Sequence, residues 1–156
     1  MSGFTCRLKI ATDYTPAEIF ALLRENLPFV TGVSDDDPRF PRTLFTTMDA
    51  LQIDVTATRL PHYTEEDFGF RPTVTVSFEL GRNLLGERET EGEGNVARGV
   101  DWIVNHLNGD MVYMVNGDSP GLLRRGNQIW LDRKDSYWRE EDLQKLTFPY
   151  EWKKLS

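Results

Sequence analysis

Apolar and polar residues alternate along three segments of the chain, and this two-residue period predicts β-strands with one buried face. The first segment covers residues 4–10, the second begins at or before Asp49 and ends near Thr58, and the third covers residues 73–80. The third is also rich in valine and threonine, which favour strands. We expect the second and third strands to pair antiparallel.

Two other segments have the period of a helix with one buried face. Residues 15–18, Thr-Pro-Ala-Glu, form a capping box with proline at the first helical position, so a helix is predicted to begin here and to end before Pro28. The second helix is predicted from the apolar stripe Val96, Val100, Ile103, Val104 and Leu107. Asn108 and Gly109 tolerate the left-handed turn that ends such a helix.

Three segments without a clear period separate these elements. They are residues 28–41, 61–72 and 81–94, which are rich in proline, glycine or acidic side chains. We expect all three to be exposed loops and the third to be mobile.

The C-terminal third continues with short apolar runs separated by turns. The runs are residues 111–115, 122–123 and 129–131, and the turns are Asn116-Gly117 and Gly126-Asn127. This arrangement predicts a β-meander, and a short helix is expected near Arg139–Leu146.

The order of the predicted elements is strand, helix, strand, strand, helix, strand, followed by one or two further strands. This is the split βαβ, or ferredoxin-like, order. The predicted fold class is therefore α+β, with an antiparallel sheet, two helices on one of its faces and a C-terminal β-meander extension. At 156 residues the chain has the size of one domain, so a single domain is predicted over residues 1–156.

The charge balance limits the partners of the chain. It has 25 acidic and 18 basic residues and a net charge of -7, which disfavours nucleic acid and anionic membranes and favours a basic protein partner. The sequence has no apolar run of signal-peptide or membrane-span length. The single cysteine, Cys6, rules out an intramolecular disulfide and fits a reducing compartment, so we expect a cytoplasmic protein.

Residues that carry chemistry are few. His62 lies beside Glu65 and Glu66, where a general base or a metal would fit, but a solvated loop histidine is the simpler interpretation. His106 lies four residues after Trp102, off the apolar stripe, and is interpreted as part of an aromatic–histidine surface pair.

Known nucleophile, phosphate-binding and metal motifs are also missing from the sequence. Cys6 alternates with core residues and is interpreted as a small buried apolar side chain. Gly92 and Gly94 precede a helix, but a third glycine and a phosphate-binding lysine are absent. Residues 35–37, Asp-Asp-Asp, match no calcium loop. We therefore predict no enzymatic activity, no catalytic residue, no metal and no cofactor.

Acidic side chains are concentrated in the predicted loops. Residues 34–67 contain eight acids and three bases. Acidic loops can steer association with a basic partner, although they also serve simply as a soluble surface. The predicted partner-binding residues are Asp35, Asp36, Asp37, Glu65, Glu66, Asp67, Glu87, Glu89, Glu91 and Glu93.

The C-terminal tail combines aromatic side chains with lysines. The aromatic residues are Tyr137, Trp138, Phe148, Tyr150 and Trp152, and Lys153 and Lys154 follow them. Such residues can stack on nucleic acid bases, but we favour a segment that folds back to cover the sheet or its edge.

Residues 95–131 resemble small immunity proteins of bacterial polymorphic-toxin systems, in particular the Sit-type immunity family of myxobacterial toxin-exchange systems. The resembling features are the helix with Val100-Asp101-Trp102, the strand entry at Gly109-Asp110, and the turn and strand from Asn116 to Arg125. They cover about a quarter of the chain. The resemblance implies that the protein binds and neutralises a cognate toxin, but it identifies no binding residues; Arg124 and Arg125 are explained equally well by a solvated hairpin.

The leading hypothesis is therefore a non-enzymatic protein-binding domain, an immunity protein whose acidic loops bind a basic toxin domain. One alternative is a small enzyme or ligand-binding domain that uses His62 with residues 65–67. Another is a structural or adaptor subunit, because an exposed sheet edge can pair with a second copy. The sequence leaves the oligomeric state open.

Overall fold

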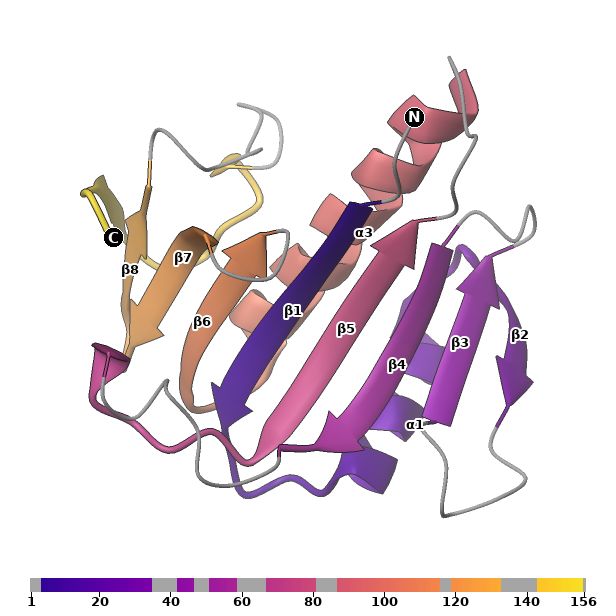
Figure 1. Ribbon diagram of the computed structural model, residues 1–156, viewed down its shortest axis with the longest axis horizontal. Helices are drawn as coiled ribbons and strands as arrows, with labels where there is room; N and C mark the ends of the chain where they lie inside the picture. The colour runs from indigo at the N-terminus through magenta and orange to yellow at the C-terminus, as the bar shows by residue number, and fades with distance from the viewer. Residues whose placement is uncertain are drawn as a thin grey trace.

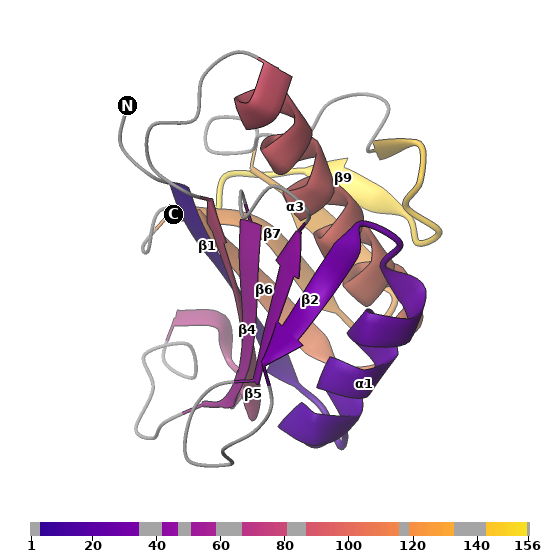
Figure 2. The ribbon, with the colours of Figure 1, turned by 90° about the vertical axis from the view of Figure 1, so that its right-hand side faces the viewer.

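The computed structural model describes residues 4–34, 42–46, 51–58, 67–80, 87–115, 119–132 and 143–155. They form an α+β fold, in which an open and mostly antiparallel sheet of nine strands is covered on one face by helices α1 and α3 (Figures 1 and 2). Within the described residues, no helix as long as α1 or α3 covers the opposite face of the sheet. No helix in the described part of the chain is long and apolar enough to cross a membrane.

The elements follow one another along the chain as β1 (Phe4–Ala11), α1 (Pro16–Asn26), β2 (Val30–Ser34), β3 (Arg42–Thr46), β4 (Leu51–Ala57), β5 (Val74–Leu80), α3 (Glu87–His106), β6 (Asp110–Val115), β7 (Ser119–Arg125), β8 (Gln128–Leu131) and β9 (Tyr150–Trp152). Their order across the sheet is β2-β3-β4-β5-β1-β6-β7-β8-β9. All neighbours pair antiparallel except β8 and β9, which are parallel.

The first strand lies in the middle of the sheet. β1 pairs with β5 on one side and with β6 on the other, and both pairs are antiparallel. Because β4 is antiparallel to β5, it runs parallel to β1, and α1 lies in the connection between these two strands. In the same way α3 connects β5 to β6, which also run parallel. Both connections return across the same face of the sheet (Figure 2).

The strongest sequence signals are confirmed. The three alternating segments are β1, β4 and β5, and β4 and β5 pair antiparallel. The capping box is present, because the Glu18 N–H donates to Thr15 Oγ1 at 3.1 Å and the Thr15 N–H donates to Glu18 Oε1 at 3.0 Å. Helix α1 ends at Asn26, before Pro28. Strands β6, β7 and β8 form the predicted meander.

The predicted loops contain regular structure in their described parts, and the longest pieces lie in the first and third loops. Part of residues 28–41 forms β2, an edge strand of only five residues whose pairing with β3 has an irregularity between Val30 and Gly32. A strand so short and irregular has no readable period. The prediction of a loop over residues 81–94 is wrong from Glu87 onward, where α3 begins. Glutamates near a helix N-terminus are favoured by its dipole, which offsets the low helix propensity of glycine.

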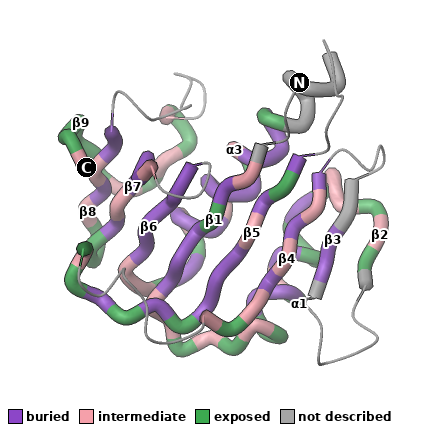
Figure 3. The backbone as a smooth tube through the Cα atoms, in the orientation of Figure 1, coloured by how far each residue is buried: buried purple, intermediate pink, exposed green. Residues whose placement is uncertain are grey.

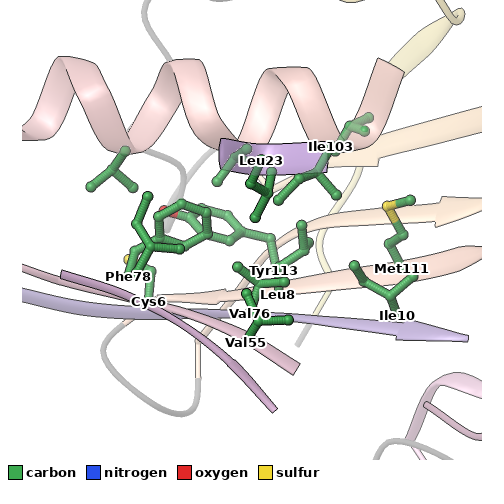
Figure 4. Packing of buried hydrophobic residues seen from close by; sticks show 14 of the residues in the cluster. Cys6, Leu8, Ile10, Leu23, Val55, Val76, Phe78, Ile103, Met111 and Tyr113 are labelled. Carbon is green, nitrogen blue, oxygen red and sulfur yellow. The ribbon is translucent and has the colours of Figure 1, made fainter. Parts of the chain in front are cut away.

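The main core lies between the helices and the sheet. Leu23 of α1 and Ile103 of α3 point toward Leu8 and Val76 of the sheet, and all four side chains are fully buried (Figure 4). Cys6 is buried in the same core, as predicted. Burial is greatest on the central strands, whereas exposed residues gather on β2 and β9 at the two edges (Figure 3).

A buried glycine brings α3 close to the sheet. A Cβ atom added at Gly99 would lie 2.8 Å from Cε1 of Phe78, closer than real Cβ contacts allow. Glycine therefore costs helix propensity at this position but permits the close approach of helix and sheet. A much smaller apolar cluster, Phe70 with Val112 and Met114, lies on the opposite face of the sheet.

Candidate protein-binding site

The structure describes the side chains of only two of the predicted acidic binding residues. Asp67 and Glu93 are both exposed. Glu87, Glu89 and Glu91 belong to α3, but their side chains lie outside the described part, as do residues Asp35, Asp36, Asp37, Glu65 and Glu66. Asp67 precedes the start of β5, whereas Glu93 follows its end, so these two residues do not form one site. A single surface built from the acidic loops stays a prediction.

The structure tests the prediction for one of the two histidines. His62 lies outside the described residues. His106 is exposed at the end of α3, and its ring stacks on Trp102 with the centroids 4.7 Å apart and the planes 16° apart. Its Nδ1 lies 2.8 Å from the carbonyl oxygen of Trp102. This confirms the aromatic–histidine pair. The described residues contain no cluster of histidine, cysteine or carboxylate groups that would hold a metal.

The aromatic tail forms the last strand of the sheet, so its predicted return to the sheet edge is confirmed. The Ile129 N–H donates to the carbonyl of Pro149 at 3.0 Å, and the Lys153 N–H donates to the carbonyl of Leu131 at 2.9 Å. Pro149 and Lys153 thus direct these main-chain groups toward β8, and along a strand residues alternate between facing one neighbour and facing the other. The main-chain groups of Tyr150 and Trp152 therefore face away from β8.

Tyr150 and Trp152 also expose their rings. Their exposed fractions are 39% and 38%, and with Val33 they are the exposed large apolar residues of the described chain. The ring centroids lie 6.3 Å apart with the planes at 89°, an edge-to-face pair. Tyrosine and tryptophan are the residue types that contribute most to protein interfaces. The outer edge of the sheet, defined here by Tyr150 and Trp152 of β9, is the candidate binding site.

The segment that precedes β9 is held against α3. The Asn105 side chain donates to the carbonyl of Lys145 at 2.8 Å, and it accepts bonds from the N–H and hydroxyl of Thr147 at 3.0 and 3.1 Å. Beyond β9, the Leu155 N–H donates to Oδ2 of Asp132 at 2.8 Å. Hydrogen bonds thus anchor the chain both before and after the aromatic pair. Because the pair is already ordered, it loses little conformational entropy when it binds a partner.

Arg124 connects this segment to the core. Its Nη1 donates to the carbonyls of Val104 and Leu107 at 2.7 Å each, and its Nε donates to the carbonyl of Gly126 at 2.8 Å. The guanidinium carbon lies 4.3 Å from the ring centroid of Phe148. Burial lowers the pKa of Arg124, an effect that the Asp110 carboxylate opposes.

The interpretation of both arginines as parts of a solvated hairpin is therefore wrong for Arg124 and correct for Arg125. Arg124 is buried, and it satisfies carbonyls at the C-terminal end of α3 that have no partner within the helix. Arg125 is exposed, and its Nη1 donates to the carbonyl of Phe68 at 2.7 Å.

The first expected result concerns the attachment of the tail. Asn105→Ala removes three hydrogen bonds to residues 145–147 and is expected to weaken the local closure of β9 by about 1–2 kcal/mol. Hydrogen exchange at the Lys153 amide, which bonds to Leu131, measures this closure. Gln144→Ala, at an exposed position of the same segment, is the control and should leave the exchange rate unchanged. Equal rates in both variants would contradict the role given to Asn105.

Comparison with known proteins identifies one family. A family model described as SitI3-like matches residues 4–142. The resemblance predicted over residues 95–131 is therefore confirmed, and it covers most of the chain rather than about a quarter. No curated protein and no solved structure matches the chain. The matched range includes β1 to β8 and ends before β9.

Proposed function

The chain belongs to the SitI3-like family of Sit-type immunity proteins, and from this premise we propose that it binds and neutralises a cognate bacterial toxin without catalysing a reaction. The observation that carries this proposal is the family match over residues 4–142. The cytoplasm is the proposed compartment, because the chain has one cysteine, the buried Cys6, and so forms no intramolecular disulfide.

The acidic loops are proposed to attract the toxin. A net charge of -7 raises the rate of encounter with a basic protein and disfavours nucleic acid as a competing partner. Exposed Asp67 and Glu93 are consistent with this role. Their separation supports long-range steering rather than one compact acidic contact. A basic toxin domain is therefore the proposed partner.

The aromatic pair of β9 is proposed to make the short-range contact. Tyr150 and Trp152 expose large rings that are already held in place, which is the arrangement expected for residues that dominate an interface. β9 lies beyond the residues that the family model matches. The contact on β9 is therefore proposed for this chain and not for the family as a whole.

The experiment compares the two edges of the sheet. The double variant Tyr150→Ala, Trp152→Ala is expected to weaken binding of the cognate toxin domain by about 30-fold or more, since each ring is proposed as an interface residue. Val33→Ala removes an exposed apolar side chain from β2 at the opposite edge and should bind like the wild type. Calorimetry measures the affinity, and survival of toxin-expressing cells measures neutralisation.

Each outcome has a distinct meaning. A wild-type chain that neither binds nor protects against this toxin contradicts the immunity function. A wild-type chain that protects, with a double variant of unchanged affinity, contradicts only the location of the contact on β9.

The fold itself is also proposed to contain a ferredoxin-like unit. The order β4-β5-β1-β6, together with connections through α1 and α3, supports this assignment. Strands β2 and β3 would then be an insertion after the first helix, and β7 to β9 a C-terminal extension.

A further inference from the structure

The central strand carries two basic residues on the face opposite the helices. Leu8 and Ile10 point into the core beneath the helices (Figure 4), so the alternation of β1 places Arg7 and Lys9 on the open face. Arg7 is exposed, whereas Lys9 is only 8% exposed. A buried lysine is uncommon, because the ammonium loses its hydration.

Few interactions within the described residues replace the hydration that the Lys9 ammonium loses on burial. Its Nζ donates to Oγ1 of Thr75 at 3.3 Å, and this oxygen lies 2.8 Å from Oγ1 of Thr58. An ammonium has three protons to donate, and among the described residues only this one bond is formed. Burial lowers the pKa of Lys9, and the neighbouring charge of Arg7 lowers it further. Among the described residues, no carboxylate opposes these two effects.

The carboxylates on the open face do not supply the missing charge. Asp54 accepts hydrogen bonds from Thr43 at 2.7 Å and from Gln52 at 3.1 and 3.2 Å. Glu79 lies on the same face of β5 and is exposed, two positions beyond the residue paired with Arg7. Asp110 lies next to Val112 on the same face of β6, where it contacts Arg125 Nε at 3.7 Å and accepts a hydrogen bond from the Gly126 N–H at 3.0 Å. None of these three carboxylates forms an ion pair with Lys9 or Arg7 within the described part of the chain.

Lys9 and Arg7 have different neighbours on the β6 side and on the β5 side of β1. On the β6 side, Val112 lies opposite Lys9 and Met114 lies opposite Arg7, and both apolar side chains are buried against Phe70. On the β5 side, Lys9 faces the hydroxyl of Thr75. A group bound here would therefore meet an apolar wall, a hydroxyl and two positive charges.

We infer that the open face around Arg7 and Lys9 accepts an aspartate or glutamate side chain of the toxin. This inference rests on the proposed function. A carboxylate oxygen would accept the remaining ammonium protons of Lys9, and the Arg7 guanidinium would bind the same group as a fork. Binding would supply a countercharge that the described residues do not provide.

The same arrangement discriminates between toxins. A partner with a carboxylate at this position neutralises Lys9, whereas a partner without one buries the cation more deeply and leaves it uncompensated. A single carboxylate is favoured over a nucleic acid, because the acidic chain as a whole repels a polyanion. The acidic loops and this basic centre therefore act on different parts of the toxin.

The test replaces Lys9 with methionine, which removes the ammonium group and keeps an unbranched apolar side chain. Lys9→Met is expected to leave the urea midpoint of the free protein unchanged or raised, because a poorly compensated charge is removed from a buried position. The same variant should bind the cognate toxin domain about 30-fold or more weakly. Lys145→Met, at an exposed position of the C-terminal segment, is the control and should change neither quantity.

A double-mutant cycle identifies the carboxylate. Each surface aspartate or glutamate of the toxin domain is changed to its amide, and one amide variant should lose no further affinity when combined with Lys9→Met. Lys9→Arg tests the charge separately from the packing and should retain more affinity than Lys9→Met.

The outcomes separate the two proposals. Failure of the wild type to bind this toxin domain overturns the proposed function. Wild-type binding together with full affinity of Lys9→Met overturns only the carboxylate site. A Lys9→Met variant with a clearly lowered urea midpoint also overturns it, because Lys9 would then be compensated within the chain. Tight binding of a labelled RNA oligonucleotide that Lys9→Met abolishes would reassign the site to nucleic acid.

Discussion

Substitution of methionine for Arg124 is expected to lower the free energy of unfolding by about 3 kcal/mol. Methionine keeps much of the apolar stem, so the loss comes from the guanidinium group. That group donates to the carbonyls of Val104, Leu107 and Gly126 from a buried position. Without it, carbonyls at the end of α3 remain buried and lose their donors, and each such group carries its own desolvation cost.

The neighbouring arginine provides the control for this result. Arg125 has a side chain that is 45% exposed, and its Nε lies 3.7 Å from Oδ2 of Asp110, a long ion pair. Arg125→Met also removes the hydrogen bond to the Phe68 carbonyl, but both interactions lie at an exposed position, so the loss should be about 1 kcal/mol or less. Urea unfolding of both variants measures the difference. Similar losses in the two variants would show that the carbonyl contacts of Arg124 contribute little to stability.

Arg124→Met should also weaken the attachment of β9, which carries the candidate binding site. Phe148 packs its ring against the guanidinium and lies two residues before β9. Removing the cation weakens this contact, so Arg124→Met is also expected to increase hydrogen exchange at the Lys153 amide, whereas Arg125→Met is not.

Much of the fold could be predicted where local sequence and tertiary packing favour the same structure. The capping box at Thr15 and Glu18 is satisfied by atoms within four residues, so its geometry needs no knowledge of the rest of the chain. The alternation in β1, β4 and β5 reflects one buried face, which is a property of any sheet covered by helices.

The elements that were missed depend on distant parts of the chain. β2 is a strand because β3 pairs with it, and five residues at an edge carry too few buried positions to show a period. Arg124 follows the alternation of Leu122 and points toward the helices, but only the position of the α3 C-terminus explains why a cation is stable there.

The candidate sites show the same limit. The sequence identified the aromatic tail, but it gave no signal that separates exposed Tyr150 and Trp152 from the partly buried Phe148. The alternation of residues 4–10 places Lys9 on the face opposite the core, where a solvent-facing lysine is expected. Its burial comes from the tertiary fold, and sequence alone carries no sign of it.

Gly109→Ala is expected to cost about 4 kcal/mol or more in the free energy of unfolding. Gly109 follows α3 with a φ of 122°, as predicted for a glycine that ends a helix. An added Cβ would lie 1.9 Å from the carbonyl oxygen of Ala11 and 2.9 Å from its carbon. Both atoms belong to the backbone at the end of β1, so neither can move aside without displacing the central strand.

Gly126→Ala separates this steric effect from the cost of a positive φ. Gly126 has a φ of 59°, and nothing lies within 4 Å of an added Cβ. Its substitution should cost only about 1–2 kcal/mol, the strain of one left-handed residue. Urea unfolding of the two variants measures both losses. A Gly109→Ala loss no larger than that of Gly126→Ala would mean that β1 shifts readily, and the close packing of the α3–β6 turn against Ala11 would then contribute little to the stability of the sheet.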